Sequence, residues 1–99
     1  MGFRNAFDAE HGERIAKQVR DKVLALAAKG GDAPEEWGQR DWDKATRAAI
    51  FELSNDLCGD DIKALIAYAT DECDGWEIME IGLDAALGAA IWCLWENEG

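Results

Sequence analysis

Side chains that could act as nucleophiles, general bases or soft metal ligands are scarce in this chain. They are His11, Ser54, Tyr68, Cys58, Cys73 and Cys93. Successive cysteines lie 15 and 20 residues apart, which fits neither a CxxC pair nor a zinc-binding spacing. An isolated histidine is usually an exposed polar residue, and catalysis would need a partner that positions it. We therefore expect neither nucleophilic catalysis nor a multi-histidine metal site, and we interpret the cysteines as small buried apolar side chains.

Carboxylates are the one reactive group that the chain concentrates. The densest cluster is Asp71, Glu72, Asp74, Glu77 and Glu80. Such a cluster could supply paired carboxylates for acid and base catalysis, or oxygen ligands for a divalent cation. A calcium loop does not fit, because placing Gly75 at the loop's glycine position puts Thr70 at the first ligand position and Ile81 at the last. A solvated acidic face is the commoner arrangement, so we expect no enzyme activity, no metal and no cofactor.

Charge is distributed unevenly along the chain. Lys and Arg number 10 against 21 Asp and Glu, which gives a net charge of −11. Residues 1–48 hold nine bases and nine acids, whereas residues 49–99 hold twelve acids and a single base, Lys63. A field of this sign repels phosphate backbones and anionic membranes and attracts basic protein surfaces. The sequence therefore predicts a basic protein partner and no direct contact with nucleic acid or membrane, although acidity that serves only solubility would give the same composition.

Composition and hydrophobic periodicity predict one all-α domain over residues 1–99. The chain has 17 Ala, 8 Leu and 7 Ile but only 2 Val, 2 Thr and one Pro, which favours helices over strands. Apolar residues recur at helical spacing in the segments 8–29, 41–57, 61–73 and 75–96. Gly30-Gly31 and Gly59 end the first two segments, and Asp41 is expected to be the N-cap of the second. The expected fold is a small four-helix bundle with one longer loop between its first two helices.

The fourth segment differs from the others because it is apolar on two faces. One face is expected to dock on the bundle. The opposite strip consists of Ile78, Ile81, Ala85, Ala89 and Trp92. Exposing this strip on a monomer would be unusual, so we expect self-association, as in a homo-oligomer, or a docked partner helix. The alternative is a central helix that the other three cover. Gly82 and Gly88 fall inside this predicted helix, where they favour close helix packing.

Five tryptophans are many for a chain of 99 residues. Trp42 and Trp76 lie on predicted core faces, whereas Trp37 falls in the loop, and Trp92 and Trp95 lie off the main stripe of the last helix. Tryptophan is both a core filler and a common anchor of interfaces. Two interpretations therefore stay open: these side chains close the ends of the bundle, or they bind a partner.

A small, acidic, helical and Trp-containing chain without a catalytic motif resembles the phage-encoded inhibitors of bacterial defence, including anti-CRISPR and DNA-mimic proteins. The resemblance is one of composition over the whole chain and involves no shared motif, so it assigns no residue a role. It implies a non-enzymatic inhibitor that binds the basic surface with which a defence complex, such as a CRISPR effector, holds nucleic acid. Immunity proteins or antitoxins that neutralise a basic nuclease are the nearest alternative, and a helical oligomeric scaffold or ligand-binding module is another.

The residues expected to bind such a partner are Asp71, Glu72, Asp74, Glu77, Glu80, Asp84, Trp37 and Trp95. The acids would meet Lys and Arg side chains, and the tryptophans would supply the uncharged part of the affinity. No charged-then-apolar signal peptide opens the chain, and Glu80 and Asp84 interrupt its longest apolar stretch. We therefore expect a soluble protein in the cytoplasm. The resemblance to phage-encoded inhibitors implies that this is the cytoplasm of a bacterial host.

Overall fold

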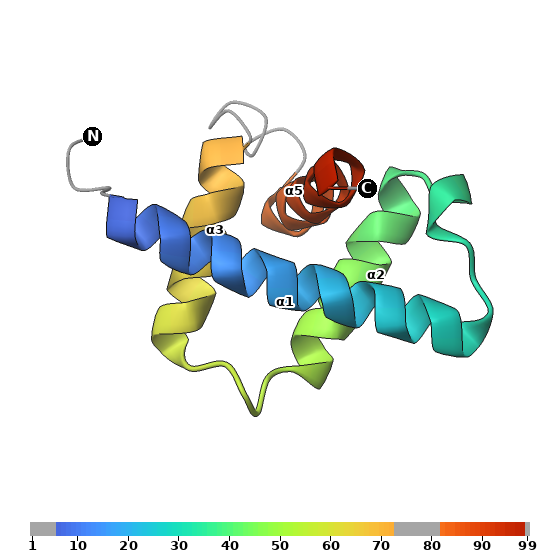
Figure 1. The fold of residues 1–99 in the computed structure, drawn as a ribbon, viewed down its shortest axis with the longest axis horizontal. Helices are drawn as coiled ribbons and strands as arrows, with labels where there is room; N and C mark the ends of the chain where they lie inside the picture. The colour runs from blue at the N-terminus through green and yellow to red at the C-terminus, as the bar shows by residue number, and fades with distance from the viewer. Residues whose placement is uncertain (1–5, 73–81, 99) are drawn as a thin grey trace.

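The computed structural model describes residues 6–72 and 82–98. Within them the chain forms α1 (Ala6–Gly30), the 3-10 turn η1 (Pro34–Glu36), α2 (Gln39–Glu52), α3 (Gly59–Glu72) and α5 (Leu83–Glu98), and these residues contain no strand. The predicted all-α fold, a small bundle of four helices, is confirmed. Figure 1 shows α1 lying across α3 and α2, with α5 seen nearly end-on between those two.

The helices pair in an interleaved order. α1 packs most extensively on α3, and α2 packs most extensively on α5, so neither pair is made of neighbours in the chain. α1 also contacts α2 and α5, which joins the two pairs into one bundle. Since α1 and most of α2 belong to the charge-balanced residues 1–48, each of them lies against a helix from the acidic residues 49–99.

Apolar side chains from all four helices form the core. The predicted stripe of α1 is buried along its length: Ile15, Ala16, Val19, Val23 and Ala27. The other helices contribute Trp42, Ala49, Leu65, Ile91 and Leu94. Burying a Val, Leu or Ile side chain contributes roughly 1.5 to 3 kcal/mol, so this shared core accounts for much of the bundle's stability.

Each of the two main helix pairs approaches closely at a glycine. A Cβ built at Gly12 of α1 would lie 2.6 Å from the carbonyl oxygen of Ala64 in α3. A Cβ built at Gly88 of α5 would lie 2.8 Å from the Cα of Asp43 in α2. Carbon atoms in ordinary contact are about 3.5 to 4.0 Å apart, so a larger residue would push the helices apart. The close packing expected at Gly88 is confirmed.

The second helix is shorter than predicted, because α2 ends at Glu52 and the expected end was residue 57. Beyond it the backbone makes tighter turns, in which the Asp56 N–H donates to the carbonyl oxygen of Leu53 at 2.8 Å. The segment Ser54-Asn55-Asp56 explains the early end, since these side chains compete with the backbone for hydrogen bonds and favour turns over helix. Leu57, expected on the inward face, packs half-buried against the core.

Two helix starts also differ from the prediction. The N-cap of α2 is Gly38 and not Asp41, because the Trp42 N–H donates to the Gly38 carbonyl oxygen at 3.1 Å. Asp41 sits three residues further on, where its carboxylate accepts the Gly38 N–H at 3.1 Å. Gly82 precedes α5 instead of lying inside a helix; its φ of 89° is in the left-handed region, and no atom lies within 4 Å of a Cβ built there. The close packing expected at Gly82 is therefore wrong, and residues 75–81 of the predicted helix lie outside the described residues.

Candidate functional site

A cluster of tryptophans joins α2, α5 and the loop before α2. Trp42 is fully buried at its centre. The ring centroids of Trp37, Trp95 and Trp92 lie 5.1, 5.3 and 6.2 Å from that of Trp42, and the Trp92 ring is nearly parallel to it at 10°. Each of the three outer rings is half-buried and packs against the core. They therefore contribute to packing and keep an exposed part, and the partner-binding role of Trp37 and Trp95 stays a prediction.

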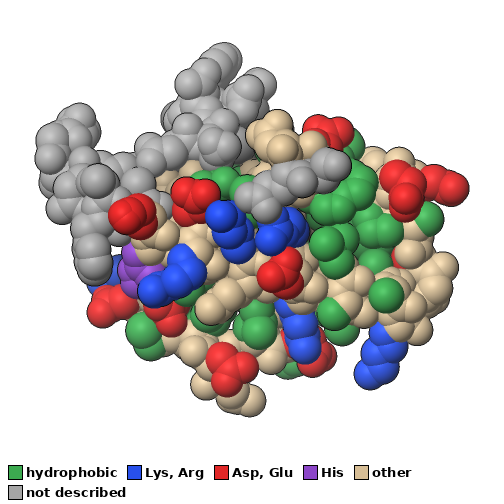
Figure 2. Space-filling model, viewed as in Figure 1, with side chains coloured by type: hydrophobic (Ala, Val, Ile, Leu, Met, Phe, Trp, Pro, Cys, Tyr) green, Lys and Arg blue, Asp and Glu red, His purple; other side chains and the backbone are tan. Residues whose placement is uncertain are grey.

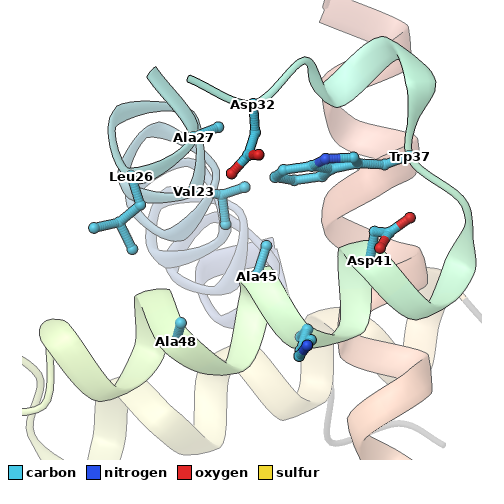
Figure 3. A pocket seen from close by; sticks show the side chains of 9 residues that line it. Val23, Leu26, Ala27, Asp32, Trp37, Asp41, Ala45 and Ala48 are labelled. Carbon is cyan, nitrogen blue, oxygen red and sulfur yellow. The ribbon is translucent and has the colours of Figure 1, made fainter. Parts of the chain in front are cut away.

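An open groove lies beside this cluster, between α1, η1 and α2. Its volume is about 390 Å³. It is lined by Val23, Leu26, Ala27, Asp32, Trp37, Asp41, Lys44, Ala45 and Ala48. Figure 3 shows the indole of Trp37 extending over the groove toward α1, with the carboxylate of Asp32 near one end of the ring and that of Asp41 near the other. Apolar walls, an aromatic ring and a few charged groups are the usual composition of a binding pocket.

The end of α1 positions Asp32 at the edge of the groove. Gly31 has a φ of 76°, which turns the chain away from the helix. The Gly31 N–H donates to the Ala28 carbonyl oxygen at 3.2 Å, and the Asp32 N–H donates to that of Ala27 at 2.8 Å. These two bonds occupy carbonyls that the helix end leaves open, so Asp32 is held directly beside the last turn of α1.

The loop and the start of α2 position the other two functional side chains of the groove. Pro34 begins η1 with a fixed φ, and its carbonyl oxygen accepts the Trp37 N–H at 3.1 Å. The indole of Trp37 then packs edge-on against Trp42, which fixes the ring over the groove. The bond from the Gly38 N–H holds the Asp41 carboxylate at the start of α2.

The electrostatics of the groove favour a cation. Asp32, Asp41 and Lys44 are all exposed, and among the described residues none of them forms an ion pair. The lining therefore carries two carboxylates and one ammonium. A cavity with one excess sign of charge concentrates ligands of the opposite sign.

Sequence reasoning named Trp37 as a candidate and missed Asp32, Asp41 and the groove itself. The available signals were the Gly30-Gly31 helix stop, which fixes the residue after it, and the three-residue spacing of Gly38 and Asp41, which is typical of a capped helix start. No pattern in the sequence shows that the loop folds back beside α1. Its position depends on the contact between the Trp37 and Trp42 rings, and the loop itself has no periodicity that would indicate this contact.

All six acids predicted to bind a partner lie outside the described side chains. These are Asp71, Glu72, Asp74, Glu77, Glu80 and Asp84. The backbone places Asp71 and Glu72 in the last turn of α3 and Asp84 in the first turn of α5, whereas residues 73–81 are not described. Other acids of residues 49–99 are exposed, namely Glu52, Asp56, Asp60 and Glu96. On the face shown in Figure 2, along α1, basic and acidic side chains are interspersed.

The strip predicted for self-association lies partly within the described residues. Ala85 and Ala89 are half-buried, and the Gln39 side chain donates to the Ala85 carbonyl oxygen at 3.2 Å. Trp92 stacks on Trp42. α5 contacts α1, α2 and α3, as α1 also contacts the other three helices, so both interpretations of the strip stay open. Ile78 and Ile81 lie outside the described residues, and self-association stays a prediction.

A polar contact that sequence reasoning missed joins α1 to α3. His11 Nε2 lies 2.8 Å from the Asp61 carboxylate, and each side chain is 19% exposed. The Cys58 N–H donates to the same carboxylate at 3.0 Å, and this bond, followed by that to His11, lowers the pKa of Asp61. The expectation of an exposed His11 without a partner is therefore wrong, because the bundle supplies a carboxylate from 50 residues away. The Cys58 side chain also hydrogen-bonds to the Asp61 carboxylate, so a thiol lies beside the pair.

Two of the three cysteines are exposed, although all three were expected to be buried. Cys58, just before α3, and Cys93, on α5, are exposed, and Cys73 lies outside the described residues. Cys58 is exposed because the chain turns at the surface before α3. Cys93 was misjudged because α5 is apolar nearly all round, so its sequence does not indicate which side faces outward. In the part of the chain that the structure describes, no three His, Cys, Asp or Glu side chains are grouped so as to hold a metal ion. Nor does any helix described there combine the length and hydropathy needed to cross a bilayer.

Three comparisons of this chain with known proteins found no match to any protein-family model, to any curated protein or to any solved structure.

Proposed function

We propose that this chain is a non-enzymatic inhibitor whose acidic side chains bind a basic protein surface that otherwise holds nucleic acid. The observation that carries the proposal is the charge of residues 49–99, where twelve acids face one base and the whole net charge of −11 arises. The acids of this half that are exposed in the described residues form no ion pair with a base there; they are Glu52, Asp56, Asp60 and Glu96. Their charge is therefore available to a partner.

The partner class follows from this charge. A surface of excess carboxylates competes with phosphate for the same Lys and Arg side chains, so a nucleic-acid-binding protein is the partner that the field suits. On the resemblance to phage-encoded inhibitors of bacterial defence, this partner is a CRISPR effector or a comparable nuclease complex. Occupying its nucleic-acid channel is sufficient for inhibition, and no chemical step is needed.

Long-range attraction and close charge pairs contribute differently to such binding. Charges at the rim of an interface mainly speed association and lose effect as salt rises. Well-buried charge pairs contribute roughly 1.5 to 7 kcal/mol each. We expect Glu77 and Glu80 to belong to the second class and Glu96 and Glu98, near the chain end, to the first.

Two double variants with the same net charge test this proposal. Glu77→Lys with Glu80→Lys, and Glu96→Lys with Glu98→Lys, each change the net charge from −11 to −7. Immobilised wild type captures its partner from lysate of a bacterium that carries a defence nuclease. The captured protein is identified and purified, and its affinity for the three chains is measured by calorimetry over a salt series. Far-ultraviolet circular dichroism confirms that each variant is folded.

We expect the first double variant to lose far more affinity than the second, binding to weaken with salt, and DNA or RNA to compete. Affinity that is indifferent to salt and to both variants would refute electrostatic docking. Binding without competition by nucleic acid would refute the mimic mechanism. The identity of the captured protein separates a defence complex from a nuclease toxin, which the immunity-protein alternative requires.

A further inference from the structure

The groove between α1, the loop that holds Trp37, and α2 is lined by groups that match every part of one kind of side chain. We propose that it is the anchor site for an arginine side chain of the basic partner protein, an inference that rests on the proposed function. The groove offers an indole face, carboxylates near both ends of that ring and an apolar floor. An arginine presents a flat cation at the end of an apolar stem, so each part of it meets a matching surface.

The aromatic ring and the carboxylates act on the guanidinium together. A planar guanidinium stacks on the Trp37 indole, which attracts cations through its negative face. The N–H groups of the guanidinium lie in its own plane, parallel to the indole, and point outward, where the groove is lined by the carboxylates of Asp32 and Asp41. A lysine ammonium is a point charge that cannot stack, so the groove distinguishes the two basic side chains.

The floor of the groove suits the stem of the arginine. Val23 and Ala27 are buried side chains of α1 that line it, and Ala45 lines it from α2. Three methylene groups can cover these apolar atoms while the charged end stays at the open side. One turn beyond Ala48 along α2, Phe51 is 77% exposed, and it offers the partner an apolar contact next to the anchor.

Lys44 gives the proposal its sharpest test, because it is the one cation in the lining. If the occupant is a cation, removing the Lys44 ammonium strengthens binding, whereas an anionic occupant would bind more weakly. Asp32→Asn removes a carboxylate whose side chain makes no hydrogen bond within the described residues, so this variant leaves the fold intact. Asp56→Asn is the matched control, since it changes the net charge equally at an exposed carboxylate that does not line the groove.

The probe is N-acetyl-arginine amide, and N-acetyl-lysine amide and the neutral isostere N-acetyl-citrulline amide are the comparisons. Binding is followed by NMR at the five tryptophan indole N–H signals, with that of Trp37 assigned through Trp37→Phe. We expect arginine amide to shift the Trp37 signal, Asp32→Asn to weaken binding about two- to fivefold, and Lys44→Met to strengthen it by a similar factor. Asp56→Asn should bind as the wild type does. Citrulline amide or lysine amide bound as tightly as arginine amide would overturn the proposal, and so would equal effects of Asp32→Asn and Asp56→Asn.

Failure of this proposal and failure of the proposed function give different results. If arginine amide does not bind but Glu77→Lys with Glu80→Lys still abolishes partner binding, the anchor is wrong and the inhibitor stands. If arginine amide binds at Trp37 but the partner ignores every charge reversal, the groove stands and the electrostatic inhibitor is wrong.

Discussion

Replacing Gly88 by alanine tests the tight packing between α2 and α5. A Cβ at this position would lie 2.8 Å from the Asp43 Cα and 3.0 Å from the Asp43 N. Because ordinary contacts between carbon atoms are about 3.5 to 4.0 Å, the two helices would have to separate by roughly 0.7 Å or more. Alanine in place of glycine gains about 1 kcal/mol of helix propensity, and overpacking costs about 1 to 3 kcal/mol. The Asp43 carboxylate, which the Cβ would also meet, can rotate away, but the Cα and N are backbone atoms that cannot. The upper end therefore applies, and we expect a net loss of about 2 kcal/mol.

The assay is urea unfolding followed by circular dichroism and by tryptophan fluorescence. A loss of about 2 kcal/mol corresponds to a melting temperature lower by roughly 8 to 16 °C for a domain of this size. Gly59→Ala is the control, because Gly59 begins α3 and nothing lies within 4 Å of a Cβ built there. Fluorescence should change only in Gly88→Ala, in which the stacked rings of Trp42 and Trp92 shift with their helices. If Gly88→Ala is as stable as the wild type or more so, the close approach of α2 and α5 is wrong.

Three further substitutions give measurable outcomes. Thr46 is 2% exposed, and its hydroxyl has no hydrogen-bond partner among the described residues. Thr46→Val should therefore raise the free energy of unfolding in urea by about 1 kcal/mol. A lower free energy of unfolding would show that the hydroxyl is hydrogen-bonded. Asp61 has a lowered pKa because it accepts bonds from Cys58 and His11, so it stabilises the fold above about pH 4 and this contribution is lost as the pH falls through its folded pKa. Asp61→Asn should therefore be less stable at neutral pH and less sensitive to acid, and urea midpoints from pH 3 to 7 that parallel the wild type would contradict this. Phe51→Ser should change the free energy of unfolding by less than about 0.5 kcal/mol in urea, since the ring is 77% exposed, and a larger loss would mean that the ring is packed.

Helical periodicity predicted the fold because most helices here have one apolar face. The apolar stripe of α1 is buried at Ile15, Val19 and Val23 as helical periodicity predicts. Periodicity was least informative for α5, which is apolar nearly all round. Ile91 is fully buried, whereas Cys93, which was expected to be buried, is exposed. A helix without a polar face does not indicate which side is inward.

The candidate site depended on contacts that local patterns do not encode. His11 and Asp61 are 50 residues apart, and only the packing of α1 on α3 brings them together. Trp37 was identified by its residue type, but its groove requires the loop to fold back beside α1, and this depends on tertiary contacts with Trp42. Glycine raised the same difficulty in a smaller form. Gly88 allows α2 and α5 to approach closely, whereas Gly82 adopts a positive φ. The sequence predicted close helix packing at both glycines.

The interleaved pairing of helices also affects how the chain folds as it is synthesised. α1 is completed at Gly30, but its main partner α3 is completed only at Glu72. At about 5 to 20 residues per second, the ribosome needs roughly two to eight seconds to make the chain between those points. During that time the apolar stripe of α1 lacks its native cover, and α2 then waits in the same way for α5. The nascent chain thus exposes core residues until α5 has left the ribosome, so we expect it to be a substrate for chaperones until then.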